Sequence, residues 1–216
     1  MTSTESGAQS KAALVIVLIG QAMATMDGSI LAIAAPSLRA NLHASGAELQ
    51  LVVAMYTMSF AALVVTGARL GDILGRRCAF VHGLAAFTAA SLAGGLAPTP
   101  PVLILARAFQ GGAAALMTAQ VLSIIQVQFH GERRAQAIGA YSMILAVGVA
   151  AGQILGGLLL SAHLMSAAWR PALLLNVPIG AVLLASSRRA LPRMAPGGRQ
   201  RLDLAGAGLL AVAFWR

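Results

Sequence analysis

Long apolar segments separated by short polar connections dominate the chain. Six of them, each roughly 18–25 residues long, can cross a hydrocarbon core of about 30 Å as an α-helix; they are residues 12–35, 49–68, 79–97, 102–125, 136–160 and 171–187. Another apolar run predicts the start of a seventh, incomplete helix at 203–216. Helices are favoured over strands because lipid leaves backbone groups to be paired internally, and the alternating pattern of a membrane barrel is absent. The pattern predicts an all-α membrane protein built on a six-transmembrane-helix bundle.

Composition agrees with this class. Hydrophobic residues make up 58% of the 216 residues and charged residues 10%, whereas soluble domains average about 45–50% and about 25%. The single cysteine, Cys78, excludes an internal disulfide and a cysteine-based metal site, and the four histidines lie far apart in the sequence. We therefore expect no metal and no disulfide framework.

The positive charges alternate between the connections. One set of connections carries most of them, in Lys11, Arg69, Arg76, Arg77, Arg133, Arg134 and the arginines of 188–202, whereas the other set carries only Arg39 and Arg170. Cytoplasmic loops of membrane proteins are enriched in Lys and Arg. The distribution thus predicts a multi-pass protein of the inner (plasma) membrane with a cytoplasmic N-terminus. It also assigns the net charge of +9 to loops that face anionic lipid, and not to nucleic-acid binding.

The domain organisation follows from these spans. Residues 1–11 form a cytoplasmic tail, 12–187 the six-helix bundle, 188–202 a basic cytoplasmic linker and 203–216 the start of the seventh helix. A cleaved signal peptide ending at "AIA" (32–34) is the alternative for the first span. Against it, Asp27 interrupts the apolar run, and cleavage would leave an odd number of spans.

The connection "GARLGDILGRR" (67–77) gathers opposite charges and regularly spaced glycines. An anchor on the cytoplasmic side explains Arg76 and Arg77 but not Asp72, because acidic residues contribute little to orientation. In a helical turn Asp72 and Arg76 are four residues apart and can pair. Glycines at every fourth position leave one face open for close approach by another helix. These features predict a joint that docks and releases, with Gly67, Gly71 and Gly75 at its contact face.

This connection resembles the signature loop of the major facilitator superfamily, G-x-x-x-D-x-x-G-R-R/K, with Gly67 or Gly71 as its first glycine. Further stretches resemble other motifs of the superfamily, in chain order: "MDGSILAIAAP" (26–36), "RAFQGG" (107–112), "GVAAGQILGG" (148–157) and "WRPALLLNVPIG" (169–180). Together they resemble the N-terminal half of the fourteen-helix drug:proton antiporters. The resemblance implies that Gly67, Gly71, Asp72, Gly75, Arg76 and Arg77 form a conformational latch, a set of groups that holds the cytoplasmic ends of two helix bundles together.

A second candidate site lies inside the spans. Arg107 is about six residues into its helix, roughly 9 Å below the outer end. A guanidinium facing lipid there is costly, so it should face the bundle interior unless it snorkels to the interface. Gln110 follows on the same face. The resemblance links this arginine to proton transfer, and because Arg does not deprotonate in proteins, we expect it to act on an acid.

Asp27 is the candidate for that acid. Burial favours its neutral form and a nearby guanidinium favours the carboxylate, so it can load and unload a proton; a capping or interfacial acid is the alternative. The segment departs from the resembled motif at Ala32, where asparagine is usual. We predict that Asp27, Arg107 and Gln110 form the proton-coupling or substrate path.

Small residues also recur along the fifth span. Gly148, Gly152 and Gly156 are four residues apart, with Gly157 alongside, and this spacing favours close helix packing. In the resembled antiporters the stretch acts as a bend. Gln153 stands where that motif has proline, the residue that kinks helices, which weakens the prediction of a bend.

Catalytic motifs are missing from the sequence: no nucleophile–base arrangement and no phosphate-binding loop appears. We predict that the chain is not an enzyme, needs no cofactor and uses a proton gradient. The expected function is proton-coupled export (antiport) of hydrophobic or amphipathic small molecules such as drugs. The alternative is a truncated half-transporter without activity alone, or a membrane assembly partner. The expected partners are the small substrate, the lipid bilayer, and a C-terminal half or a second copy.

Overall fold

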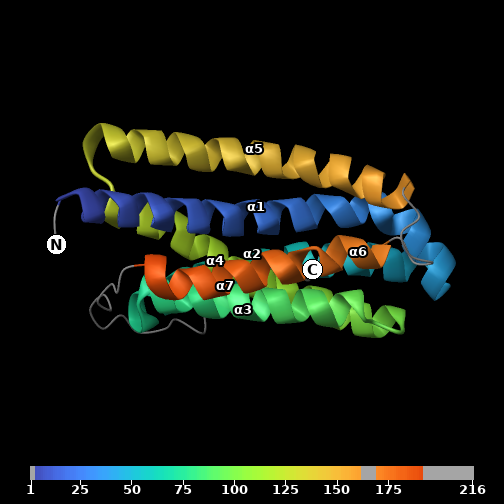
Figure 1. Cartoon of the computed structure of the whole chain (residues 1–216). Helices are drawn as coiled ribbons and strands as arrows, with labels where there is room; N and C mark the ends of the chain where they lie inside the picture. The colour runs from blue at the N-terminus through green and yellow to red at the C-terminus, as the bar shows by residue number, and fades with distance from the viewer. Residues whose placement is uncertain (1–2, 162–168, 192–216) are drawn as a thin grey trace.

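The computed structural model describes residues 3–161 and 169–191, which are almost entirely helical. The helices lie side by side along one long axis (Figure 1). Their bounds are α1 (Ser3–Leu42), α2 (Gly46–Leu74), α3 (Arg76–Gly95), α4 (Pro100–Gln128), α5 (Gly131–Ser161), α6 (Trp169–Leu174) and α7 (Asn176–Ala190). Within the described ranges, six helices are long and apolar enough to cross a membrane, counting α6 and α7 as one span. The predicted six-helix bundle is therefore confirmed.

The helices include polar residues on both sides of the apolar runs and are therefore longer than those runs. Before α2, Ser45 and Glu48 form a capping box: the Ser45 amide donates to Glu48 Oε2 (2.8 Å) and the Glu48 amide to Ser45 Oγ (3.3 Å). Pro100 is the first residue of α4, where its missing amide costs nothing. Similarly, α1 begins at Ser3, inside the segment predicted to be a tail.

The sixth predicted span, 171–187, begins earlier than expected and has two parts. α6 begins at Trp169 and Leu175 separates it from α7. Arg170 stacks on the Trp169 ring and donates to the carbonyls of Gly95 (2.9 Å) and Ala97 (3.0 Å). These contacts tie the start of the span to the end of α3. Most of the predicted linker (188–202) and all of the predicted seventh helix (203–216) lie outside the described residues.

Glycines bring α2 against α4. The Gly67 Cα faces the backbone of Ala115 and Leu116, and Gly71 faces the Gln120 side chain. Gln120 Nε2 also donates to the Gly67 carbonyl at 2.8 Å. The predicted close approach is thus present, and its partner is a helix of the same bundle. Gly75 has a different role: its positive φ of 87° ends α2 and separates it from α3.

The glycines of α5 pack against α1, which lies beside it along its length (Figure 1). A methyl group would collide with Thr25 at Gly148, and with Ser29 and the Met26 carbonyl at Gly152; at Gly156 it would make a tight contact with Ile30. Ser29 Oγ also donates across the contact to the Val149 carbonyl, at 3.1 Å. Close packing is therefore the observed role of these three glycines.

The other two residues of this predicted set lie elsewhere. No described residue comes within 4 Å of the position that a Cβ would take at Gly157, so including Gly157 in the packing face was wrong. Gln153 is exposed, and α5 continues through it without a break. The cause is helical periodicity, because residues 153 and 157 lie one position beyond the contact face.

Replacing Gly152 by leucine should therefore separate α1 from α5. The new side chain would meet the Met26 carbonyl, which is backbone and cannot rotate away. We expect a loss of about 1–3 kcal/mol in the free energy of unfolding, typical of overpacking. Denaturant unfolding in detergent micelles measures it. Gly157→Leu is the matched control and should leave stability nearly unchanged; equal losses in both variants would contradict the packing account.

Candidate functional site

Asp27 and Arg107 form an ion pair in the interior of the bundle. Their side chains are 0% and 1% exposed, and Arg107 Nη1 lies 2.5 Å from Asp27 Oδ2. Asp27 comes from the middle part of α1 and Arg107 from the first third of α4. The structure thus places Arg107 inside the bundle instead of snorkelling to the interface, and it places Asp27 in neither a cap nor an interface.

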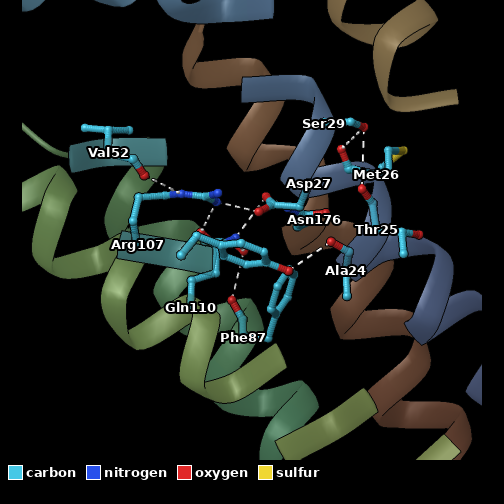
Figure 2. Close-up of polar contacts among 12 residues, drawn as sticks. Ala24, Thr25, Met26, Asp27, Ser29, Val52, Phe87, Arg107, Gln110 and Asn176 are labelled. Atoms are coloured by element: carbon cyan, nitrogen blue, oxygen red, sulfur yellow. Dashed lines mark hydrogen bonds and ion pairs between the residues drawn. The ribbon is translucent and has the colours of Figure 1, made fainter. Parts of the chain in front are cut away.

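Gln110 joins the pair one helical turn along α4. Its Oε1 accepts from Arg107 Nη1 (2.8 Å), and its Nε2 donates to Asp27 Oδ1 (2.9 Å) and to Ser91 Oγ of α3 (2.8 Å). The Ser91 hydroxyl itself donates to the Phe87 carbonyl (2.8 Å). The amide of Gln110 therefore uses its acceptor and both donors, and it holds the guanidinium and the carboxylate at once (Figure 2).

The guanidinium of Arg107 is also held from α2. Its Nε donates to the Val52 carbonyl (3.3 Å), and its Cζ lies 4.3 Å from the centre of the Tyr56 ring, a cation–π arrangement. The Tyr56 hydroxyl donates to the Ala24 carbonyl of α1 at 2.9 Å. Gly111 permits this contact, because any side chain there would collide with the Tyr56 carbonyl. The neighbouring helix that Gly111 admits is α2.

Asn176 completes the site and was missed by the sequence interpretation. It is the first residue of α7, it is fully buried, and its Nδ2 donates to Asp27 Oδ1 at 2.6 Å. Its Oδ1 is buried without a hydrogen-bond partner among the described residues. The available signal was one polar residue in the apolar run "PALLLNVPIG" (171–180). Tyr56 and Ser91 were also missed, because their hydrogen-bond and ring partners lie far away in the sequence.

The cluster balances one negative against one positive charge away from water. Breaking such a buried pair by removing one partner typically costs about 3–5 kcal/mol. Among the described residues, Arg107, Gln110 and Asn176 all contact the Asp27 oxygens as hydrogen-bond donors. No cluster of three or more His, Cys, Asp or Glu side chains that could hold a metal occurs in the described part of the chain.

The charged groups of the predicted latch lie at a helix junction. Asp72 Oδ1 is 3.7 Å from Arg76 Nη2, across the break at Gly75, and both side chains are partly exposed. At this exposure such a pair contributes little to stability by itself. The structure therefore brings Asp72 and Arg76 together as expected, and the latch role stays a prediction.

The fold and the buried ion pair define a multi-pass helical membrane protein with an ionisable site inside its bundle. A family profile described as Major Facilitator Superfamily matches residues 17–216. The chain belongs to the Major Facilitator Superfamily. Its family consists of transporters and not enzymes, which agrees with the sequence prediction.

Three curated proteins show which members of the family this chain is similar to in sequence. It is 44% identical to a cephamycin export protein of Amycolatopsis lactamdurans, covering 93% of this chain and 41% of that protein. It is 39% identical to a puromycin resistance protein of Streptomyces alboniger (93% and 40%) and 34% identical to a tetracenomycin C resistance and export protein of Streptomyces glaucescens (94% and 37%). The chain thus spans less than half the length of these relatives.

Solved structures support the fold. A bacterial homologue of the human lysosomal transporter Spinster, inward-facing and unoccupied, matches with a TM-score of 0.72 at 20% identity, over 91% of this chain and 46% of that one. A proton:xylose symporter matches with a TM-score of 0.73 at 11% identity, over 87% and 46%. In both cases the match covers about half of the solved transporter.

Proposed function

We infer that this chain is the N-terminal helix bundle of a proton-coupled exporter of hydrophobic or amphipathic small molecules. The observation that carries the proposal is the buried pair of Asp27 and Arg107, held by Gln110. A buried, paired acid is expensive to keep in a membrane bundle and marks ion or proton pathways. The curated relatives include export and resistance proteins for antibiotics, and this supports the substrate class.

Asp27 would be the proton-binding group and Arg107 the group that adjusts it. While Arg107 donates to Asp27, the carboxylate form is favoured; movement of either helix that lengthens this contact favours protonation. Substrate binding that draws Arg107 or Gln110 away would then couple to proton exchange. The energy source in this proposal is the proton gradient, with no cofactor.

A second bundle would complete the transport path. Secondary transporters place the substrate at the interface of two repeats that rock against each other, and the chain spans less than half of its curated relatives. We therefore propose that it acts with a C-terminal half or with a second copy, and that it is inactive as a monomer. In this arrangement Asp72, Arg76 and Arg77 latch the cytoplasmic ends of the two bundles.

Reconstituted vesicles test the proposal. The chain is incorporated with a C-terminal half, a proton gradient is imposed, and export of a fluorescent amphipathic cation is followed. Export that depends on the gradient is expected. Export that is unchanged when the gradient is collapsed would contradict proton coupling, and export by the strict monomer would contradict the need for a second bundle.

The orientation has a separate test in Cys78. This residue is the only cysteine of the chain and its side chain is exposed, two residues after Arg76. A cytoplasmic N-terminus puts it on the cytoplasmic side. A membrane-impermeant thiol reagent should therefore label it only after cells are permeabilised. Labelling in intact cells, measured against a cysteine-free Cys78→Ser control, would reverse the proposed topology.

A further inference from the structure

The neutral form of Asp27 finds no hydrogen-bond acceptor among the side chains that contact it in the described part of the chain. Arg107 donates to Oδ2, and Gln110 and Asn176 donate to Oδ1. These donors suit the carboxylate. Once a proton binds, the acid carries an O–H group that points at donors, and a buried donor without a partner costs about 1–3 kcal/mol. A neighbouring group must therefore change before the neutral acid is satisfied.

Among the described residues, the polar neighbours that reach the cluster from α2, α3 and α4 do not supply that acceptor. Arg107 of α4 has donors only. The Tyr56 hydroxyl of α2 is engaged with the Ala24 carbonyl, and Ser91 of α3 reaches Asp27 only through Gln110. Described residues of α7 contribute only the amide of Asn176 to Asp27.

The two amides differ in what a rotation would cost. Gln110 Oε1 accepts from Arg107, and its Nε2 donates to both Asp27 and Ser91. Turning this amide would break all three bonds and point an NH₂ group at a guanidinium. Asn176 Oδ1 has no bond to lose, because it is buried without a hydrogen-bond partner among the described residues. Turning the Asn176 amide gives up one bond and frees an acceptor, with no change in side-chain shape (Figure 2).

We propose that Asn176 is a positioning residue that responds to the protonation of Asp27, donating from Nδ2 to the carboxylate and accepting at Oδ1 from the neutral acid. The proton comes from water that reaches the site, binds Asp27 Oδ1 and returns to water when the amide turns back. No bond other than this O–H forms or breaks. The proposal rests on Asp27 as the proton site. Because Asn176 begins α7, directly after the break at Leu175, the rotation connects the acid of α1 to the sixth span.

Selective labelling gives a direct test because the chain contains only two asparagines, Asn41 and Asn176. The chain is labelled with ¹⁵N in the asparagine side chain and placed in lipid nanodiscs. NMR follows the two NH₂ groups against pH, while infrared spectroscopy follows the carbonyl band of the buried acid. The Asn176 signal should move with the same midpoint as the Asp27 band. The signal of Asn41, which is exposed at the end of α1, is the internal control.

Two variants test the role of Asn176 through the infrared carbonyl band of Asp27, which a change in packing alone would not shift. In Asn176→Leu the neutral Asp27 loses its acceptor, so its carbonyl band should shift to higher wavenumber. Asn176→Ser, whose hydroxyl donates or accepts by rotation, should restore part of the shift. Ser187→Ala is the matched control: Ser187 is buried on the same helix but donates to the Leu183 carbonyl, and the band should stay in place.

The outcomes separate this inference from the function on which it rests. An Asn176 signal that stays constant while Asp27 titrates would overturn the role of Asn176 and leave the proton site intact. Absence of any titration assigned to Asp27, over the pH range in which the chain stays folded, would contradict the proton site and with it the role of Asn176. The labelled wild-type chain decides both points even where a variant fails to fold.

Discussion

Replacement of Asp27 by asparagine should abolish proton-driven export by a transporter assembled from this bundle and a C-terminal half. Asparagine keeps the size of the side chain and an oxygen that can accept from Arg107, but it cannot bind and release a proton. Asp27 is the fully buried acid paired with Arg107, so the substitution removes the group that would bind the coupled proton. We expect gradient-driven export to fall to the level of empty vesicles, while the variant stays folded with reduced stability.

The measurement is the initial rate of gradient-driven export of a fluorescent amphipathic cation from vesicles. Glu132→Gln is the matched control, because it makes the same acid-to-amide change at an exposed position in the first turn of α5. Export should persist in this control. Retention of gradient-driven export in Asp27→Asn would refute Asp27 as the coupling acid.

Replacement of Arg107 by leucine should give the largest loss of stability, together with loss of export. The variant leaves Asp27 buried without its charge partner, and such a break costs about 3–5 kcal/mol. It also removes the contacts with the Val52 carbonyl and the Tyr56 ring. The free energy of unfolding in detergent micelles measures the effect.

A double variant identifies the cause of that loss. Adding Asp27→Asn removes the unpaired charge, so the pair Asp27→Asn/Arg107→Leu should be more stable than Arg107→Leu alone. Arg170→Leu is the matched control: Arg170 also stacks on an aromatic ring, but its donors reach backbone carbonyls and no acid. Asp27→Asn should not rescue it. If the double variant loses as much free energy of unfolding as Asp27→Asn and Arg107→Leu lose in sum, the charge-pair account is contradicted.

The features of this chain that could be predicted from sequence are those with local signals. Apolar length identified the spans, and spacing put Arg107 and Gln110 on one face of α4. The buried position of Arg107 followed from the cost of a guanidinium in lipid. The glycines of α5 predicted close packing, although the helical period excludes Gly157 from the contact.

The other contacts depend on which helices pack together, and nothing local encodes that. The amide of Asn176 meets Asp27 only because α7 packs beside α1, and Tyr56 lies under Arg107 only because Gly111 lets α2 approach α4. The division of the sixth span at Leu175 also left no sequence signal that we recognised. Pairings of this kind become visible once the tertiary arrangement is known.

The central claim is that Asp27 exchanges the coupled proton, and substrate-induced proton release tests it most directly. The assembled transporter is purified in weakly buffered detergent solution, the amphipathic cation is added, and released protons are followed with a pH-sensitive dye. Wild-type protein should release protons and Asp27→Asn should release none, whereas Glu132→Gln should match the wild type. Undiminished release from Asp27→Asn would contradict the claim.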